Sequence, residues 1–414
     1  MDVAGEAHRK DILGKQIELL RSVWQPVTWA AFGLLIPVLL LSRLPLPGGH
    51  SFGYNSFARN LTLFAIAGGL VGARGLRLER SWIGVPLLVY LLVAALSVAV
   101  NHGEWGGVRV LIAATGVFFV TLSLTSLTDD ARWLFHWLGA FVVLIVIREL
   151  SLHPWLLAMR ESYRHEFVTD HPNALGYCFA LASPIFLAGL ANRGRRPFAA
   201  AYATAALVGV LVTFSRAAWL GAVVGIVTLA VGMHRRRMAA GAMALVVGVT
   251  APVAIATGYL SLGRTEADWQ RVQIIEASLS LFREHWLFGI GFGISNLERL
   301  FPGRYLELFG KSLFLFHSHN FYVDLLTGTG VIGAIAGGWL IVRLVRLARA
   351  CIEHADGEAA RLEAIGYASS IGVLLLIGLF DMPLYHAKLL FVLAVIWAMA
   401  ETAARRRPQA RTRN

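Results

Sequence analysis

The chain has 414 residues, of which 57% are hydrophobic and only 15% are charged. A typical soluble domain is about 45–50% apolar and about 25% charged, so this composition excludes an ordinary soluble fold. The two cysteines, Cys178 and Cys351, lie in or beside apolar segments and cannot form a disulfide framework. The formal charge of +12 does not indicate nucleic-acid binding, because Lys and Arg collect in the cytoplasmic loops of membrane proteins.

Apolar segments long enough to cross a bilayer as helices recur along the chain. We predict twelve spans, at residues 27–42, 57–73, 81–100, 108–125, 133–149, 173–191, 198–214, 217–233, 238–258, 319–342, 362–380 and 387–402. One helix over both 198–214 and 217–233 would be about 54 Å long, too long for a hydrocarbon core of about 30 Å. We therefore expect two helices with a tight turn at Ser215 and Arg216, in an all-α polytopic membrane protein.

The basic residues predict the orientation of these spans. If the N-terminus is cytoplasmic, the inner segments hold 23 of the 37 Lys and Arg residues, so both termini are expected inside. The predicted parts are a cytoplasmic segment (1–26), nine spans (27–258), a large periplasmic loop (259–318), three spans (319–402) and a basic tail (403–414). The polar start, Met1–Gln25, does not resemble a cleavable signal. The short inner loops contain no nucleotide-binding motif, which argues against ATP-driven transport.

The large outer loop is predicted to contain an amphipathic helix at 269–286. Its apolar side chains recur at helical spacing, at Val272, Ile275, Leu279, Phe282 and Trp286. Arg271 lies roughly 60° from the centre of this stripe on a 100° helical wheel, so it either leans toward whatever the stripe covers or is solvated. The run Gly289–Gly293 follows a helix rather than a strand, which favours a tight turn over a phosphate-binding loop.

Arg216 is the only charge between two long apolar spans. An ionisable residue within the membrane is by default a candidate functional residue. A guanidinium at the outer rim offers a planar fork of donors to a phosphate or carboxylate. The structural alternative is an anchor that reaches the lipid headgroups.

His317 and His319 lie where the large loop meets the tenth predicted span. A histidine near its usual pKa of about 6.5 suits a general base at neutral pH. A metal site is less favoured, because no further ligands follow at a recognisable spacing, and a histidine satisfied at the membrane boundary is the structural alternative. In another outer segment, Asp381, His386 and Lys388 are weaker candidates for the same cavity, together with Arg59.

Several motifs resemble those of bacterial O-antigen ligases, over roughly residues 165–345. His319-Asn320, nine residues and then Gly330-Val-Ile-Gly333 match the pattern H-[NSQ]-x9-G-x-x-G. Other segments are similar to the family's "SR", "hPllGvGfG" and "hPN" elements, namely 213–221, 285–293 and 171–173. The chain departs from the family at Trp286, where proline is common, and at Ala334.

The resemblance implies a GT-C-like fold in the bacterial inner membrane and a glycosyltransferase with a periplasmic active site. It implies transfer of O-antigen from undecaprenyl pyrophosphate to a sugar hydroxyl of lipid A–core, with no cofactor. Cations at the outer rim can stabilise the leaving pyrophosphate without a metal. We assign Arg216 and Arg271 to the pyrophosphate, and His319 to a general base that gives inversion. The expected substrate-binding residues are His317, Asn320, Arg59, Lys388, His386 and Asp381.

Three alternatives stay open at this point. An O-antigen polymerase and a protein O-oligosaccharyltransferase belong to the same superfamily and resemble this chain in the same segments. A transporter or flippase of lipid-linked glycan belongs to a different class. It is disfavoured because the sequence has no inverted repeat and no matched pair of broken helices.

Overall fold

The computed structural model describes residues 81–102, parts of 108–124, and 132–158, 171–232, 265–314, 317–382 and 386–405. Every regular element in these ranges is a helix. In the first half they are α3 (Gly84–Val100), α5 (Arg132–Leu152), the 3-10 helix η2 (Pro154–Ala158), α6 (Pro172–Gly189), α7 (Arg196–Val212) and α8 (Arg216–Gly232). In the second half they are α10 (Thr265–Glu284), α11 (Ile294–Phe309), α12 (Phe321–Glu353), α13 (Gly357–Ile377) and α14 (Ala387–Arg405).

Four of the described helices, α5, α6, α12 and α13, are long and apolar enough to cross a membrane. Three more apolar helices, α3, α7 and α8, have 17 residues each, which is about the shortest length that spans a bilayer. The described residues therefore support a helical membrane protein but not the predicted count of twelve spans. The predicted spans at 27–42, 57–73 and 238–258, and Arg59, lie outside the described residues.

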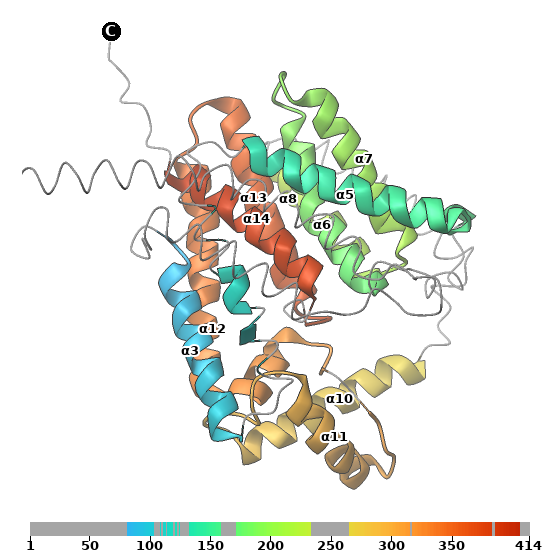
Figure 1. Ribbon diagram of the computed structural model, residues 1–414, viewed down its shortest axis with the longest axis vertical. Coiled ribbons are helices and arrows are strands. Elements are labelled where there is room, and N and C mark those ends of the chain that lie inside the picture. The colour runs from blue at the N-terminus through green and yellow to red at the C-terminus, as the bar shows by residue number, and fades with distance from the viewer. Residues whose placement is uncertain are drawn as a thin grey trace, which may run out of the picture.

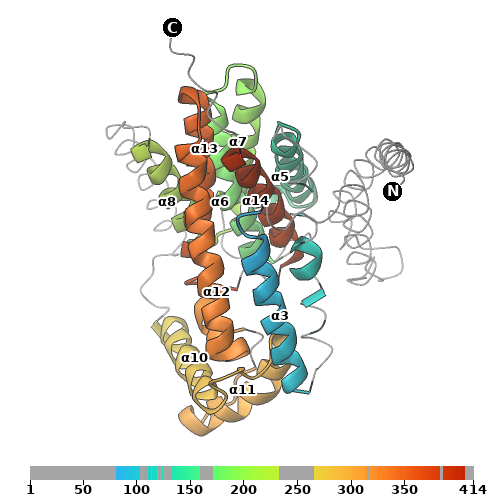
Figure 2. The same ribbon diagram turned by 90° about the vertical axis from the view of Figure 1, so that its left-hand side faces the viewer.

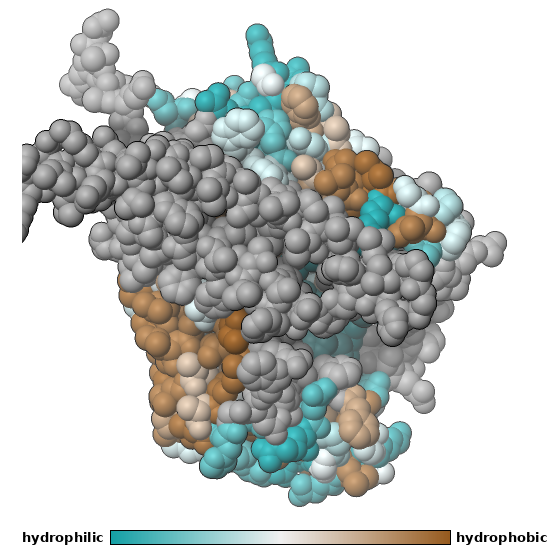
Figure 3. Space-filling view, in the orientation of Figure 1, coloured by the Kyte–Doolittle hydropathy of each residue, from teal (hydrophilic) through white to brown (hydrophobic). Residues whose placement is uncertain are grey.

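Helix α6 forms the centre of the bundle. It packs against α7, α8, α13 and α14, and 89% of its apolar window is buried inside the protein (Figures 1 and 2). Apolar side chains instead face outward on α3, at Val85, Leu92, Leu96 and Val100. Figure 3 shows a hydrophobic area at the lower left, where α3 lies in Figure 1, above a more hydrophilic lower end where α10 and α11 lie. This outward apolar face is expected of a helix in contact with lipid.

The turn between α7 and α8 agrees with the predicted break at Ser215 and Arg216. Helix α7 ends at Val212 and α8 begins at Arg216, with Phe214 in the left-handed region at φ 50°. Gly176 of α6 lies directly against this turn, because a Cβ atom there would be 2.8 Å from Thr213 Oγ1. The absence of a side chain at Gly176 thus lets α6 approach the turn that precedes Arg216.

Helix α12 is bent at Gly330, whereas the sequence predicted one regular span over 319–342. Gly330 has φ 66° and ψ −167°, a conformation restricted almost entirely to glycine. The N–H of Val331 donates to the carbonyl of Trp286 at 2.8 Å instead of closing a helical turn. A Cβ atom at Gly330 would collide with the carbonyl oxygen of Leu287. The bend therefore depends on contact with the glycine-rich segment.

Helices α10 and α11, within the predicted large loop, pack against each other and form a helical unit with its own core. The core contains Ile274, Ala277, Leu281, Ile290, Leu297, Phe301 and Tyr305. The predicted apolar stripe is not the face of the helix that is buried, because Val272 and Trp286, which belong to the stripe, are 49% and 57% exposed. Helix α10 has two apolar faces, and the one that packs against α11 carries the small residue Ala277, which allows close approach of the two helices.

Candidate functional site

The segment 317–320 leads into α12 and holds its two histidines in a fixed turn. Asn320 caps the helix, since its side-chain oxygen accepts the N–H groups of Tyr322 and Val323 at 3.0 and 3.1 Å. Its amide nitrogen donates to the carbonyl of Leu379 at 3.1 Å. His319 has φ 56°, an uncommon value for a residue other than glycine. Such a conformation is maintained only where the surroundings fix it.

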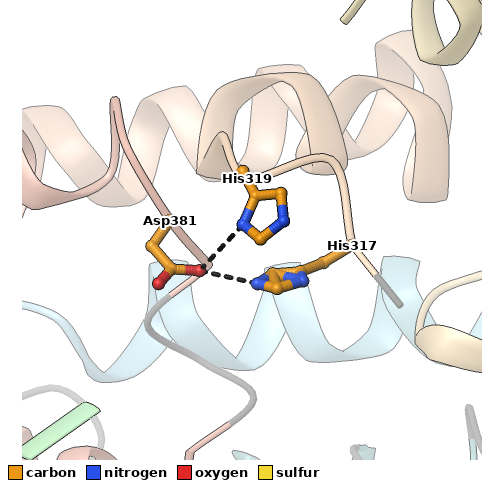
Figure 4. A group of neighbouring side chains, drawn as sticks. All are labelled: His317, His319 and Asp381. Atoms are coloured by element: carbon orange, nitrogen blue, oxygen red, sulfur yellow. Dashed lines mark hydrogen bonds and ion pairs between the residues drawn. The ribbon is translucent and has the colours of Figure 1, made fainter. Parts of the chain in front are cut away.

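Asp381, between α13 and α14, lies at the centre of the histidine site (Figure 4). Its Oδ1 is 2.6 Å from Nε2 of His317 and 3.9 Å from Nδ1 of His319. Its Oδ2 accepts the hydroxyl of Tyr177 at 2.9 Å, and Oδ1 also accepts the N–H of Met382 at 2.8 Å. A buried carboxylate needs such donors. The sequence-predicted residues His317, His319 and Asp381 therefore lie together.

Burial and neighbouring charges determine the protonation states of Asp381 and His317. Burial raises the pKa of the Asp381 carboxyl, but the adjacent His317 and His386 outweigh it and keep that pKa below its usual value. Burial lowers the pKa of His317 to about 4, against the opposing effect of Asp381. At neutral pH a neutral His317 therefore donates its Nε2–H to an ionised Asp381, which can only accept.

His319 differs from His317 in exposure and in its hydrogen bonding to Asp381. Its side chain is 31% exposed, against 18% for His317. Burial and the positive charge of Arg271 lower the pKa of His319, while Asp381 acts to raise it. At 3.9 Å its Nδ1 lies beyond hydrogen-bond distance from Asp381 Oδ1. His319 is therefore a neutral, partly accessible imidazole at pH 7.

Three potential metal ligands, His317, His319 and Asp381, lie within 4.8 Å of one another. Two ligands of a tetrahedral zinc ion with bonds of about 2.0 Å would lie about 3.3 Å apart. His317 Nε2 and Asp381 Oδ1 are separated by only 2.6 Å, which is a hydrogen-bond distance. This arrangement fits a shared proton better than a shared metal ion.

Arg216 and Arg271 lie on two separate helices, α8 and α10. Arg271 is an exposed residue of α10, and its charge acts on His319. Arg216 is the exposed first residue of α8 and follows the buried Ser215. The side chain of Ser215 hydrogen-bonds the hydroxyl of Tyr177, which in turn donates to Asp381. The turn that precedes Arg216 is thus connected to the histidine site through Tyr177.

Two other predicted site residues, His386 and Lys388, lie in different settings. His386 stacks on His171, with ring centroids 6.5 Å apart, and both act on His317 electrostatically. Lys388 is only 4% exposed and lies among the buried residues of α14. Its placement differs from that of an open phosphate-binding residue.

Tyr177 and Asp324 were missed by the sequence predictions. Tyr177 is buried in α6 and joins Asp381 to Ser215. Asp324 is buried on α12 and accepts the N–H of Ser318 at 2.9 Å. An acidic residue inside an apolar span was the available signal for Asp324, because an intramembrane charge is costly unless it has a role. Nothing in the local sequence singled out Tyr177.

The fold and the site define a helical membrane protein with a cluster of imidazoles, a carboxylate and a nearby guanidinium. Residues 201–336, about a third of the chain, match the sequence model of the family described as O-Antigen ligase. The match supports the O-antigen ligase/polymerase superfamily and a glycosyltransferase-like enzyme. The matched segment includes Arg216, Arg271 and His319, whereas Tyr177 and Asp381 lie outside it. Comparison with curated proteins finds no match.

Proposed function

We propose that this protein is an O-antigen ligase of the bacterial inner membrane, with cytoplasmic termini and a periplasmic active site. It transfers O-antigen from undecaprenyl pyrophosphate to a sugar hydroxyl of lipid A–core. The observation that carries the proposal is the meeting of His319, Asp381 and the field of Arg271 at one site, in a chain whose residues 201–336 match the ligase family.

His319 is the proposed general base. A neutral imidazole at pH 7 can accept the proton of the acceptor hydroxyl as that oxygen attacks the anomeric carbon. The bond to the pyrophosphate oxygen breaks in the same displacement, so the anomeric configuration inverts. The greater exposure of His319 favours it over His317, whose Nε2–H is committed to Asp381. His317 instead holds the carboxylate beside the base.

Arg216 and Arg271 are the proposed ligands of the pyrophosphate. Both are exposed cations: Arg216 is the first residue of α8, and Arg271 lies on α10, where its charge acts on His319. A guanidinium presents paired donors that match phosphate oxygens, and it stabilises the charge that develops on the leaving group. The reaction as proposed needs no metal ion, since these cations supply the positive charge.

The experiment uses purified full-length protein in proteoliposomes with lipid-linked glycan and lipid A–core. We expect glycan-capped lipid A–core, an unchanged rate in EDTA, and a loss of about 10²–10⁴-fold in His319→Ala. Stable membrane insertion of that variant is the required control. Wild-type transfer by His319→Ala would remove the histidine from the mechanism, and inhibition by EDTA reversed by one divalent ion would revive the metal alternative.

The same assay separates the ligase from its relatives. Growth of glycan on the lipid-linked donor rather than on lipid A–core would identify a polymerase. Movement of lipid-linked glycan across the bilayer without any transfer would identify a flippase.

A further inference from the structure

Asp324 lies one turn into α12 and is 6% exposed. Its side chain turns back toward the histidine segment, where Oδ1 accepts the backbone N–H of Ser318 at 2.9 Å. Its own N–H donates to the carbonyl of Asn320 at 2.9 Å. Ser318 is the residue between the two histidines, so this buried carboxylate contacts the segment that presents His319.

The backbone on both sides of His319 is held by hydrogen bonds. On one side Ser318 is bound to Asp324, and its hydroxyl donates to the carbonyl of Asn320 at 2.9 Å. On the other side Asn320 caps α12, and the N–H of Phe321 donates to the carbonyl of Gly378 at 2.7 Å. His319, with φ 56°, lies between these two anchors. Such a backbone conformation persists only when its neighbours fix it.

The other oxygen of the Asp324 carboxylate, Oδ2, has no partner among the described residues that would compensate the free-energy cost of burying it. Asp324 Oδ2 and the hydroxyl of Tyr90 are both buried without a hydrogen-bond partner among the described residues, and the two groups interact electrostatically. A fold that needed only a satisfied core would not gain from a half-paired acid at this position. The contact that the carboxylate does make is the one with Ser318.

We propose that Asp324 is a positioning residue, which fixes the backbone of His319 by binding the N–H of Ser318 and so aims the imidazole at the acceptor hydroxyl. The inference rests on the proposed function, because it assigns Asp324 to the same reaction. Asp324 acts through His319 and does not touch the reacting atoms. A misdirected base slows the chemical step with little effect on binding of the lipid-linked donor.

The test compares substitutions of Asp324 that keep or remove the side-chain oxygen that accepts the Ser318 N–H. In Asp324→Asn the amide oxygen still accepts the Ser318 N–H, and the amide nitrogen takes the place of the unpaired Oδ2, so kcat should stay within about threefold of wild type. In Asp324→Leu the acceptor is lost at similar volume. We expect kcat to fall at least about tenfold while KM for the lipid-linked donor changes less than about twofold.

Glu401 provides a matched control, since it is also a buried carboxylate that accepts hydrogen bonds, from Ser81 and from the N–H of Ile83. Glu401→Leu should lower Tm but leave the kcat of the folded protein unchanged. If Asp324→Leu does not fold, Asp324→Ser replaces it, because the shorter side chain cannot reach the Ser318 N–H.

Two outcomes would overturn the inference. One is a wild-type kcat in folded Asp324→Leu or Asp324→Ser while His319→Ala is inactive, which would leave the proposed function intact. The other is an Asp324→Asn variant that is folded but as inactive as the leucine variant. Full activity of His319→Ala in the same preparation would instead refute the proposed function itself.

Discussion

Two buried carboxylates at different places in the bundle, Asp381 and Glu401, serve different purposes. Glu401 accepts hydrogen bonds from Ser81 at 2.7 Å and from the N–H of Ile83 at 3.2 Å, and pairs with Arg405 at 3.3 Å. These donors do not titrate near neutral pH, so Glu401 joins the start of α3 to the end of α14 as a structural group.

Asp381 is equally buried, but its partners differ in kind. It binds the imidazole of His317 at 2.6 Å and lies 3.9 Å from the more exposed His319. An imidazole, unlike the partners of Glu401, can accept a proton and release it again, so this carboxylate lies beside groups that can take part in proton transfer. Burial alone therefore does not identify a functional carboxylate, whereas burial against titratable partners near solvent does.

The largest effect is expected at the bend of α12. Gly330→Ala must adopt a positive φ and meets the carbonyl of Leu287, so the free energy of unfolding should fall by about 3 kcal/mol or more. The yield of folded protein and its Tm measure this. Gly338→Ala on the same helix is the control, because a Cβ there has open space. Equal Tm values for the two variants would show that the bend is not required.

Asp381→Asn should have the second-largest effect, and it tests directly whether Asp381 and Glu401 serve different purposes. The amide has one acceptor oxygen in place of two and carries no charge, so the orientation of His317 is weakened and kcat should fall about 10–100-fold. Glu401→Gln should lower Tm without changing kcat. Steady-state transfer rates normalised to folded protein decide between them, and similar losses of kcat in both variants would remove the distinction.

The pH dependence gives a smaller and directional effect. The lowered pKa of His319 keeps the imidazole neutral below its usual range, so the acid limb of kcat/KM should lie below pH 6.5. Asp381 raises this pKa, hence Asp381→Asn should move the limb to still lower pH. Arg271 lowers it, hence Arg271→Gln should move the limb to higher pH. A limb that stays in place in both variants would assign it to another group.

The smallest effect is expected at the exposed end of α12. Arg349 pairs with Glu353 at 2.6 Å on the surface, far along the helix from the histidine segment. Exposed ion pairs of this kind contribute little to stability. Arg349→Ala should therefore leave both Tm and the transfer rate unchanged, and a clear loss of activity would indicate a contact that the histidine site does not explain.

Much of the site could be predicted from sequence. The charges and imidazoles stand out because they interrupt apolar segments, and His317, His319 and Asp381 do lie together. The break between α7 and α8 followed from helix length against bilayer thickness. Which residues contact the donor and the acceptor stays a prediction.

Local sequence decided that the described segments are helical and apolar. Composition and periodicity within a few helical turns indicate which side chains are buried, but they do not indicate which other segment covers them. Tertiary structure alone decided which face of α10 is buried, where α12 bends, and that Tyr177 contacts Asp381 and Asp324 contacts the histidine segment. These features depend on contacts between segments up to 204 residues apart, such as Tyr177 with Asp381. Spacing along one helix cannot encode a hydrogen bond to a distant segment, since its geometry exists only once the bundle has packed.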